Sequence, residues 1–144
     1  MSEFIPNNNY REIIKSLPIM CVDVIIKNAT GEILLIKRAN KPLKNEWWVV
    51  GGRVLKGEKI ADAVKRKTIQ EVGLKLKDIK PLGYYEEIFN ESPLGDRDTI
   101  HTVSFVFSAK VESGNVKLDN QSNGYSWFKH LPKRFTRNFT KANE

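Results

Sequence analysis

Two glycines followed by a charged helical face are the residues of this chain best suited to chemistry. Gly51 and Gly52 come directly after an apolar run, and glycine lets a backbone turn and approach a ligand closely. Arg66, Gln70 and Glu71 follow at spacings that place them on the polar face of a predicted amphipathic helix. A glycine loop beside a carboxylate and a guanidinium group can hold a metal ion and a phosphate.

The predicted elements around this loop are a short strand and one prominent helix. The strand covers residues 47–50, and the helix opens at Glu58 and continues to Val72. Within the helix, apolar residues recur every three to four positions, at Ala61, Val64, Thr68 and Val72. Gly73 stands where a helix C-terminus is expected. The pattern therefore predicts a strand, then a loop, and then a helix that ends at Gly73.

The rest of the chain is predicted to be mainly strands, with a short helix near each end. Strands are expected at residues 19–26, 33–38, 81–89, 99–109 and 125–128, and helices at residues 7–16, capped by an asparagine, and within 133–144. Residues 75–80 and 119–124 are polar and are expected outside the strands. One domain spanning 1–144 with a mixed sheet, of class α/β or α+β, accounts for these elements.

Composition narrows the class of protein. The 144 residues carry a formal charge of +7 and a single cysteine, so a disulfide framework is excluded and a reducing compartment is expected. We expect no signal peptide and no membrane span, and hence a cytoplasmic protein. The charge favours an anionic partner, but the lysines are scattered along the chain. Nucleic acid is therefore not the expected partner.

Fixed residues at fixed spacings give a family resemblance. The signature positions are Gly52, Glu58, Arg66, Glu71, Gly73 and Leu74. They resemble the Nudix signature, G-x5-E-x7-R-E-U-x-E-E-x-G-U, where U is apolar. The resemblance implies a Nudix-type α/β/α sandwich with a mixed sheet. It also implies hydrolysis of a nucleoside diphosphate linked to another group, with a divalent metal.

Two departures from that signature change the expected chemistry. Lys67 and Gln70 stand where the signature has glutamates, so Glu71 is the only carboxylate of the three. Positions 67, 70 and 71 share one helix face. Three carboxylates there could hold two or more magnesium ions, but one carboxylate beside a lysine cannot. An attack on phosphorus by water held between several metal ions is therefore not expected.

A similar loss is typical of the GDP-mannose mannosyl hydrolases, a Nudix branch that this chain resembles from about Leu17 to Trp127. The shared residues outside the signature include Asp23, Trp48, Gly95, His101, Gln121 and Tyr125. In that branch water attacks the anomeric carbon of the sugar. The resemblance implies a homodimeric enzyme that hydrolyses GDP-mannose or GDP-glucose to GDP and the sugar.

The same resemblance implies roles for seven residues. One Mg²⁺ per subunit would be held by the Gly51 carbonyl, the Glu71 carboxylate, the Gln121 side chain and the diphosphate. Arg38, Arg53 and Arg66 would contact the diphosphate or the departing nucleotide, and Asp23 would lie near the sugar. Residue chemistry leaves alternatives open: Arg66 could pair with Glu58, and Asp23 with a neighbouring lysine or arginine.

The residue that would deprotonate water is missing. A family histidine is replaced by Ser122 and a second one by Asn90, and neither side chain is a general base near neutral pH. His101 is interpreted as a structural residue of a strand, which leaves Asp119, Glu86 or Glu87 as substitutes. Two further functions therefore stay open: a Nudix pyrophosphatase that cuts at phosphorus, and a non-catalytic nucleotide-binding module.

Overall fold

The computed structural model describes residues 4–94 and 99–143, so Gly95 lies outside the described residues. The helices are α1 (Asn7–Ser16), α2 (Ile60–Val72) and α3 (Lys133–Ala142). The strands are β1 (Ile19–Lys27), β2 (Ile33–Arg38), β3 (Trp47–Trp48), β4 (Val50–Arg53), β5 (Lys75–Phe89), β6 (Ile100–Ser113) and β7 (Ser122–Phe128). Within the described residues, no helix is both long enough and apolar enough to span a membrane.

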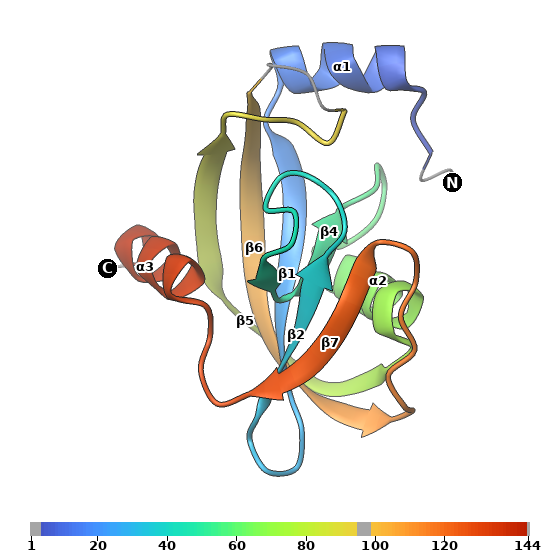
Figure 1. Ribbon diagram of the computed structural model, residues 1–144, viewed down its shortest axis with the longest axis vertical. Coiled ribbons are helices and arrows are strands. Elements are labelled where there is room, and N and C mark those ends of the chain that lie inside the picture. Colours follow the sequence, from blue (N-terminus) through green and yellow to red (C-terminus); the bar gives the residue numbers. More distant parts are fainter. Residues whose placement is uncertain (1–3, 95–98, 144) are drawn as a thin grey trace.

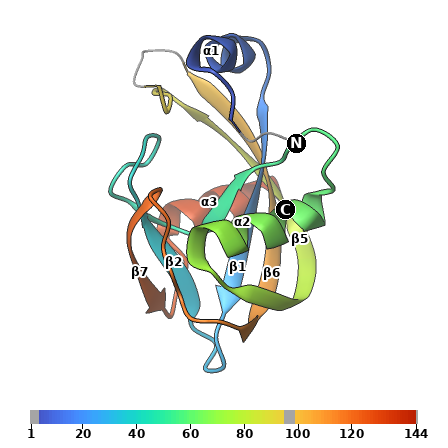
Figure 2. The same cartoon turned by 90° about the vertical axis from the view of Figure 1, so that its right-hand side faces the viewer.

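The strands form one mixed sheet between two helices. Its main path is β3-β2-β1-β6-β5, with β4 paired to β1 and β7 paired to β2. The β1–β6 pair is parallel, whereas β4 and β2 run antiparallel to β1. The two figures show α2 and α3 on opposite sides of this sheet, with α1 set apart at one end (Figures 1 and 2). The expected α/β/α sandwich with a mixed sheet is confirmed.

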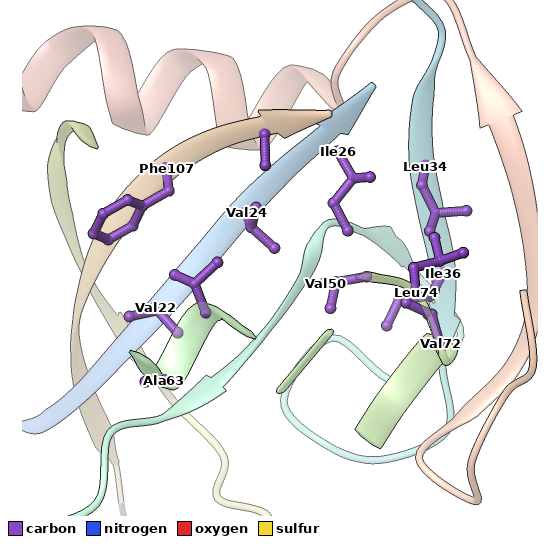
Figure 3. Packing of buried hydrophobic residues seen from close by; sticks show 12 residues of the cluster. Val22, Val24, Ile26, Leu34, Ile36, Val50, Ala63, Val72, Leu74 and Phe107 are labelled. Atoms are coloured by element: carbon purple, nitrogen blue, oxygen red, sulfur yellow. The ribbon is translucent and has the colours of Figure 1, made fainter. Parts of the chain in front are cut away.

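Each face of the sheet has its own hydrophobic core. Because side chains alternate along a strand, Val22, Val24 and Ile26 of β1 all point toward α2, where they join Ala63, Val64 and Val72 (Figure 3). The opposite core is built around Phe135 of α3, which is fully buried. Its ring packs edge-on against Trp48 and Tyr85, with centroid separations of 5.5 and 5.3 Å.

Gly51 and Gly52 lie in a strand, and the expectation that they form a loop was wrong. The predicted strand 47–50 is divided between β3 and β4, and β4 includes both glycines. In β4, Gly51 pairs with Asp23 of β1. A Cβ atom on Gly51 would lie within 3.0 Å of the Val22 carbonyl oxygen and of the Asp23 side chain. Glycine therefore lets β4 lie close against β1.

Several predicted boundaries were also wrong. Helix α2 begins at Ile60 rather than Glu58, because Glu58 closes the preceding turn by accepting the backbone N–H of Leu55. Strand β5 includes the polar residues 75–80, with register shifts that absorb a positive φ at Asp78. The last strand starts at Ser122 rather than Tyr125. Pro6, and not an asparagine, occupies the N-cap position of α1.

Glu87 attaches α3 to the sheet and gives a prediction for stability. Its buried carboxylate accepts a hydrogen bond from Arg134 at 2.9 Å and another from Asn138. Glu87→Ala leaves both donors without this acceptor, so the free energy of unfolding should fall by about 2 kcal/mol. Urea unfolding followed by tryptophan fluorescence measures the change. Glu86→Ala removes a neighbouring exposed carboxylate and is the matched control; equal losses in the two variants would contradict the assignment.

Candidate active site

A pocket of about 620 Å³ opens between the ends of several elements. All seven residues that the sequence singled out line it: Asp23, Arg38, Gly51, Arg53, Arg66, Glu71 and Gln121. They come from β1, β2, β4, α2 and the turn before β7. Of the described lining side chains, five are lysine or arginine and two are aspartate or glutamate. The pocket therefore favours an anionic ligand.

Helix α2 contributes a buried ion pair to this pocket. Lys67 Nζ lies 3.2 Å from Glu71 Oε1, and the two side chains are only 9% and 5% exposed. Burial raises the pKa of the Glu71 carboxyl, and the charge of Lys67 opposes that rise. The sequence identified Lys67 only as a lost carboxylate, although lysine and glutamate four residues apart on one helix face are a known pairing.

The oxygen atoms around Glu71 fit one divalent cation rather than several. Glu71 Oε2 is buried and has no hydrogen-bond partner among the described residues, an arrangement that is rare unless a ligand completes it. Gln121 is exposed in the same pocket and offers a neutral oxygen. Within residues 4–94 and 99–143, no group of three or more His, Cys, Asp and Glu side chains could hold a metal ion.

Asp23 is buried against a tyrosine that the sequence did not identify. Tyr85 of β5 donates its hydroxyl hydrogen bond to Asp23 Oδ2 across 62 positions of sequence. Burial raises the pKa of Asp23 to about 7, while the Tyr85 hydrogen bond and the charge of Arg38 act in the opposite direction. The first partner of Asp23 is thus Tyr85, and not the lysine or arginine considered from the sequence. Both residues line the pocket.

The raised pKa of Asp23 predicts how stability depends on pH. An unfolded aspartate titrates near pH 4, so between pH 4 and about 7 the folded state binds the extra proton at Asp23. Stability from this group therefore falls as pH rises through that window, by on the order of 4 kcal/mol. Asp23→Asn removes the titration, so the variant should gain stability relative to wild type from pH 4.5 to pH 8. Urea unfolding at both pH values measures this gain.

The control for this titration is Asp62→Asn, which alters an exposed carboxylate of α2. Its stability difference from wild type should stay constant across the same pH range. A constant difference for Asp23→Asn as well would contradict the buried titration.

Each of the three arginines, Arg38, Arg53 and Arg66, contacts a different part of the pocket wall. Arg66 pairs with Glu58 at 2.6 Å and donates to the Arg53 carbonyl at 2.8 Å, so the pairing left open by the sequence is present. Arg53 lies over the Tyr10 ring of α1, 4.9 Å from its centroid. Arg38 Nε donates to the Pro42 carbonyl at 2.8 Å. These contacts connect the β2–β3 loop, the turn before α2 and α1 to one site.

Ser122 lies in the pocket, whereas the substitutes considered for the base, Asp119, Glu86 and Glu87, are not among the described lining residues. The Ser122 hydroxyl is buried without a hydrogen-bond partner among the described residues, and Ser122 is the register partner of Arg38. His101 pairs in register with Ile88 on β5, and its Nε2 lies 3.8 Å from Glu86. Asp119 accepts the backbone N–H of Gln121. Neither His101 nor Asp119 is among the described lining residues.

Comparison with known proteins identifies the family. Residues 18–131 match the NUDIX domain. The chain belongs to the NUDIX domain family. The matched segment includes the seven predicted site residues, from Asp23 to Gln121. NUDIX hydrolases generally use a divalent metal such as Mg²⁺ and bind nucleotide-derived substrates.

The NUDIX relatives of this chain have names that refer to different substrates or pathways. The chain is 31% identical over 117 residues to the low-salt glycan biosynthesis protein Agl8 of Haloferax volcanii, covering 81% of this chain and 74% of that one. It is 38% identical over 119 residues to an ADP-ribose pyrophosphatase of Methanocaldococcus jannaschii, covering 81% and 66%. Among solved structures, a MutT NUDIX hydrolase from Burkholderia pseudomallei superposes with a TM-score of 0.72 at 24% identity, covering 87% and 98%.

Proposed function

We propose that this protein is a Mg²⁺-dependent NUDIX hydrolase of nucleotide sugars that cleaves GDP-mannose or GDP-glucose to GDP and the sugar. The observation that carries the proposal is that Glu71 is the only carboxylate that α2 turns toward the pocket, with Lys67 against it. Attack on phosphorus between two metal ions uses several ligands of this kind. Departure of a nucleoside diphosphate from a sugar carbon instead requires cations around the leaving group.

The side chains of the pocket have distinct roles in this reaction. Arg38 and Arg53 contact the diphosphate as charge develops on the departing nucleotide. Arg66 acts through its bonds to Glu58 and to the Arg53 carbonyl, which hold the turn against α2. The sugar lies next to Asp23.

The Mg²⁺ ligands are the Glu71 carboxylate, the Gly51 carbonyl and the Gln121 side chain. When bound, Mg²⁺ offsets the negative charge of the diphosphate. The glycan-related name of the Haloferax relative agrees with a sugar-containing substrate.

A second candidate is a pyrophosphatase that cuts at phosphorus. The relative that is named an ADP-ribose pyrophosphatase, 38% identical to this chain, favours it. The replacement of the expected base by Ser122 also leaves a third candidate, a module that binds a nucleotide without hydrolysing it. Both alternatives use the same cationic pocket, so the position of bond cleavage decides among the three.

Hydrolysis in ¹⁸O-labelled water separates these candidates. GDP-mannose and ADP-ribose are each incubated with the protein and Mg²⁺, and the products are analysed by mass spectrometry. Label on the sugar of GDP-mannose is the expected result. Label on a phosphate would overturn the proposal in favour of the pyrophosphatase, and nucleotide binding without turnover of either compound would overturn it in favour of a binding module.

A further inference from the structure

Lys67 holds an unusual position for a lysine, inside the pocket wall rather than on the surface. Its side chain is 9% exposed and its ammonium group lies against Glu71 Oε1. Lysine is seldom buried unless it is paired with an anion. Lys65, two residues away on the same helix, is exposed. The burial of Lys67 is therefore specific to this position and not a property of the basic helix.

The neighbouring strand leaves room for this side chain. Gly52 of β4 faces Lys67 so closely that a Cβ atom there would overlap Lys67 Cε and lie 3.0 Å from Cδ and 3.1 Å from Nζ. The lysine stem therefore runs across a position of β4 that has no side chain. This packing fixes where the ammonium group enters the pocket.

Only one oxygen atom of the Glu71 carboxylate contacts Lys67. Lys67 contacts Glu71 Oε1, while Oε2 of the same carboxylate has no hydrogen-bond partner among the described residues. An ammonium group has three donors, and among the described residues Lys67 forms its ion pair with Glu71. The Glu71 carboxylate thus lies between the Lys67 ammonium group and the part of the pocket in which a divalent cation would bind.

We propose that the ammonium group of Lys67 is a built-in cation for the diphosphate, present in place of a second metal ion and in competition with the first for Glu71. This inference rests on the proposed function, because it assigns the group that meets the diphosphate at α2. It follows that Lys67 has two opposite effects on binding. It weakens the binding of a divalent cation to Glu71, and it strengthens the binding of a diphosphate when no metal is present.

Two titrations without turnover test this inference. Lys67→Met removes the charge with a stem of similar length, and Lys67→Gln does so with a polar end; Lys65→Met is the matched control on the exposed face of α2. Calorimetry measures the affinity for Mn²⁺ alone and, in EDTA, the affinity for inorganic pyrophosphate. Circular dichroism checks folding, and Lys67→Gln decides if Lys67→Met does not fold.

The expected signature is a change in opposite directions. Both Lys67 variants should bind Mn²⁺ about tenfold more tightly and pyrophosphate about tenfold more weakly, as removal of one nearby charge predicts, while Lys65→Met changes neither. Unchanged or weaker Mn²⁺ binding, or unchanged pyrophosphate binding, would overturn the inference. The outcome is separate from the proposed function: opposite shifts without GDP-mannose hydrolysis would overturn only the function, and hydrolysis without the shifts only the role of Lys67.

Discussion

Glu71→Gln is expected to lower Mg²⁺-dependent hydrolysis by about 100-fold or more, because it removes the only charged ligand that the protein supplies to the proposed metal site. Glutamine keeps the shape of the side chain and an oxygen atom, so the loss reports the charge and not the volume. A second measurement does not depend on activity. Mg²⁺ should raise the melting temperature of the wild-type protein, since a ligand that binds only the folded state stabilises it, and the variant should lose this response.

The same substitution has a structural cost that must be separated from the catalytic one. It leaves Lys67 buried without its anion, which should lower the free energy of unfolding by roughly 3 kcal/mol. The double variant Glu71→Gln/Lys67→Met removes both charges, so it should recover most of the stability and none of the activity. Recovery of activity in the double variant, or an unchanged response of Glu71→Gln to Mg²⁺, would show that Glu71 is not a metal ligand.

The parts of the fold with strong local patterns could be predicted from the sequence. Helix α2 has a regular apolar spacing and a C-terminal glycine, and Gly73 does adopt a left-handed conformation with φ of 70°. Strands β1 and β2 are nearly continuous apolar runs, and their predicted bounds differ from the structure by at most one residue. The seven residues that line one pocket came from the family resemblance and not from a local pattern.

Features that depend on distant contacts could not be predicted in this way. The Tyr85 hydroxyl of β5 meets Asp23 of β1 across the intervening strand β6. An aromatic residue in a strand gives no local sign of such a partner. The length of β5 was missed for a related reason. Residues 75–80 belong to β5 despite their many charged side chains, because Leu76 and Ile79 pack against the hydrophobic core.

Gly51 shows the same limitation at the centre of the site. Two glycines after an apolar run read as a loop, since glycine weakens a strand. In the structure these glycines allow close packing instead. Gly51 lets β4 lie against β1, and Gly52 lets the Lys67 side chain cross β4. The absence of two side chains thus brings the Asp23 carboxylate and the Lys67–Glu71 pair to one pocket.

Gly51→Ala is accordingly expected to lower the free energy of unfolding by about 3 kcal/mol or more. The new methyl group would meet the Val22 carbonyl oxygen and the Cα of Asp23, which belong to the backbone of a central strand and cannot move aside cheaply. Neither Gly51 nor Gly52 has a positive φ, so the cost is steric and not conformational. Urea unfolding measures it, with Gly52→Ala as the matched control.

At Gly52 the three atoms nearest to the methyl group would all belong to the flexible end of Lys67. Gly52→Ala should therefore cost less than Gly51→Ala, and Lys67→Ala, which clears the space, should remove most of that cost in the double variant. Because Gly52→Ala pushes the ammonium group away from Glu71, it should also tighten Mn²⁺ binding, as Lys67→Met does. Equal losses of stability at the two glycines would mean that the packing of Lys67 across β4 is as rigid as the backbone of β1, and that Lys67 cannot move toward a ligand.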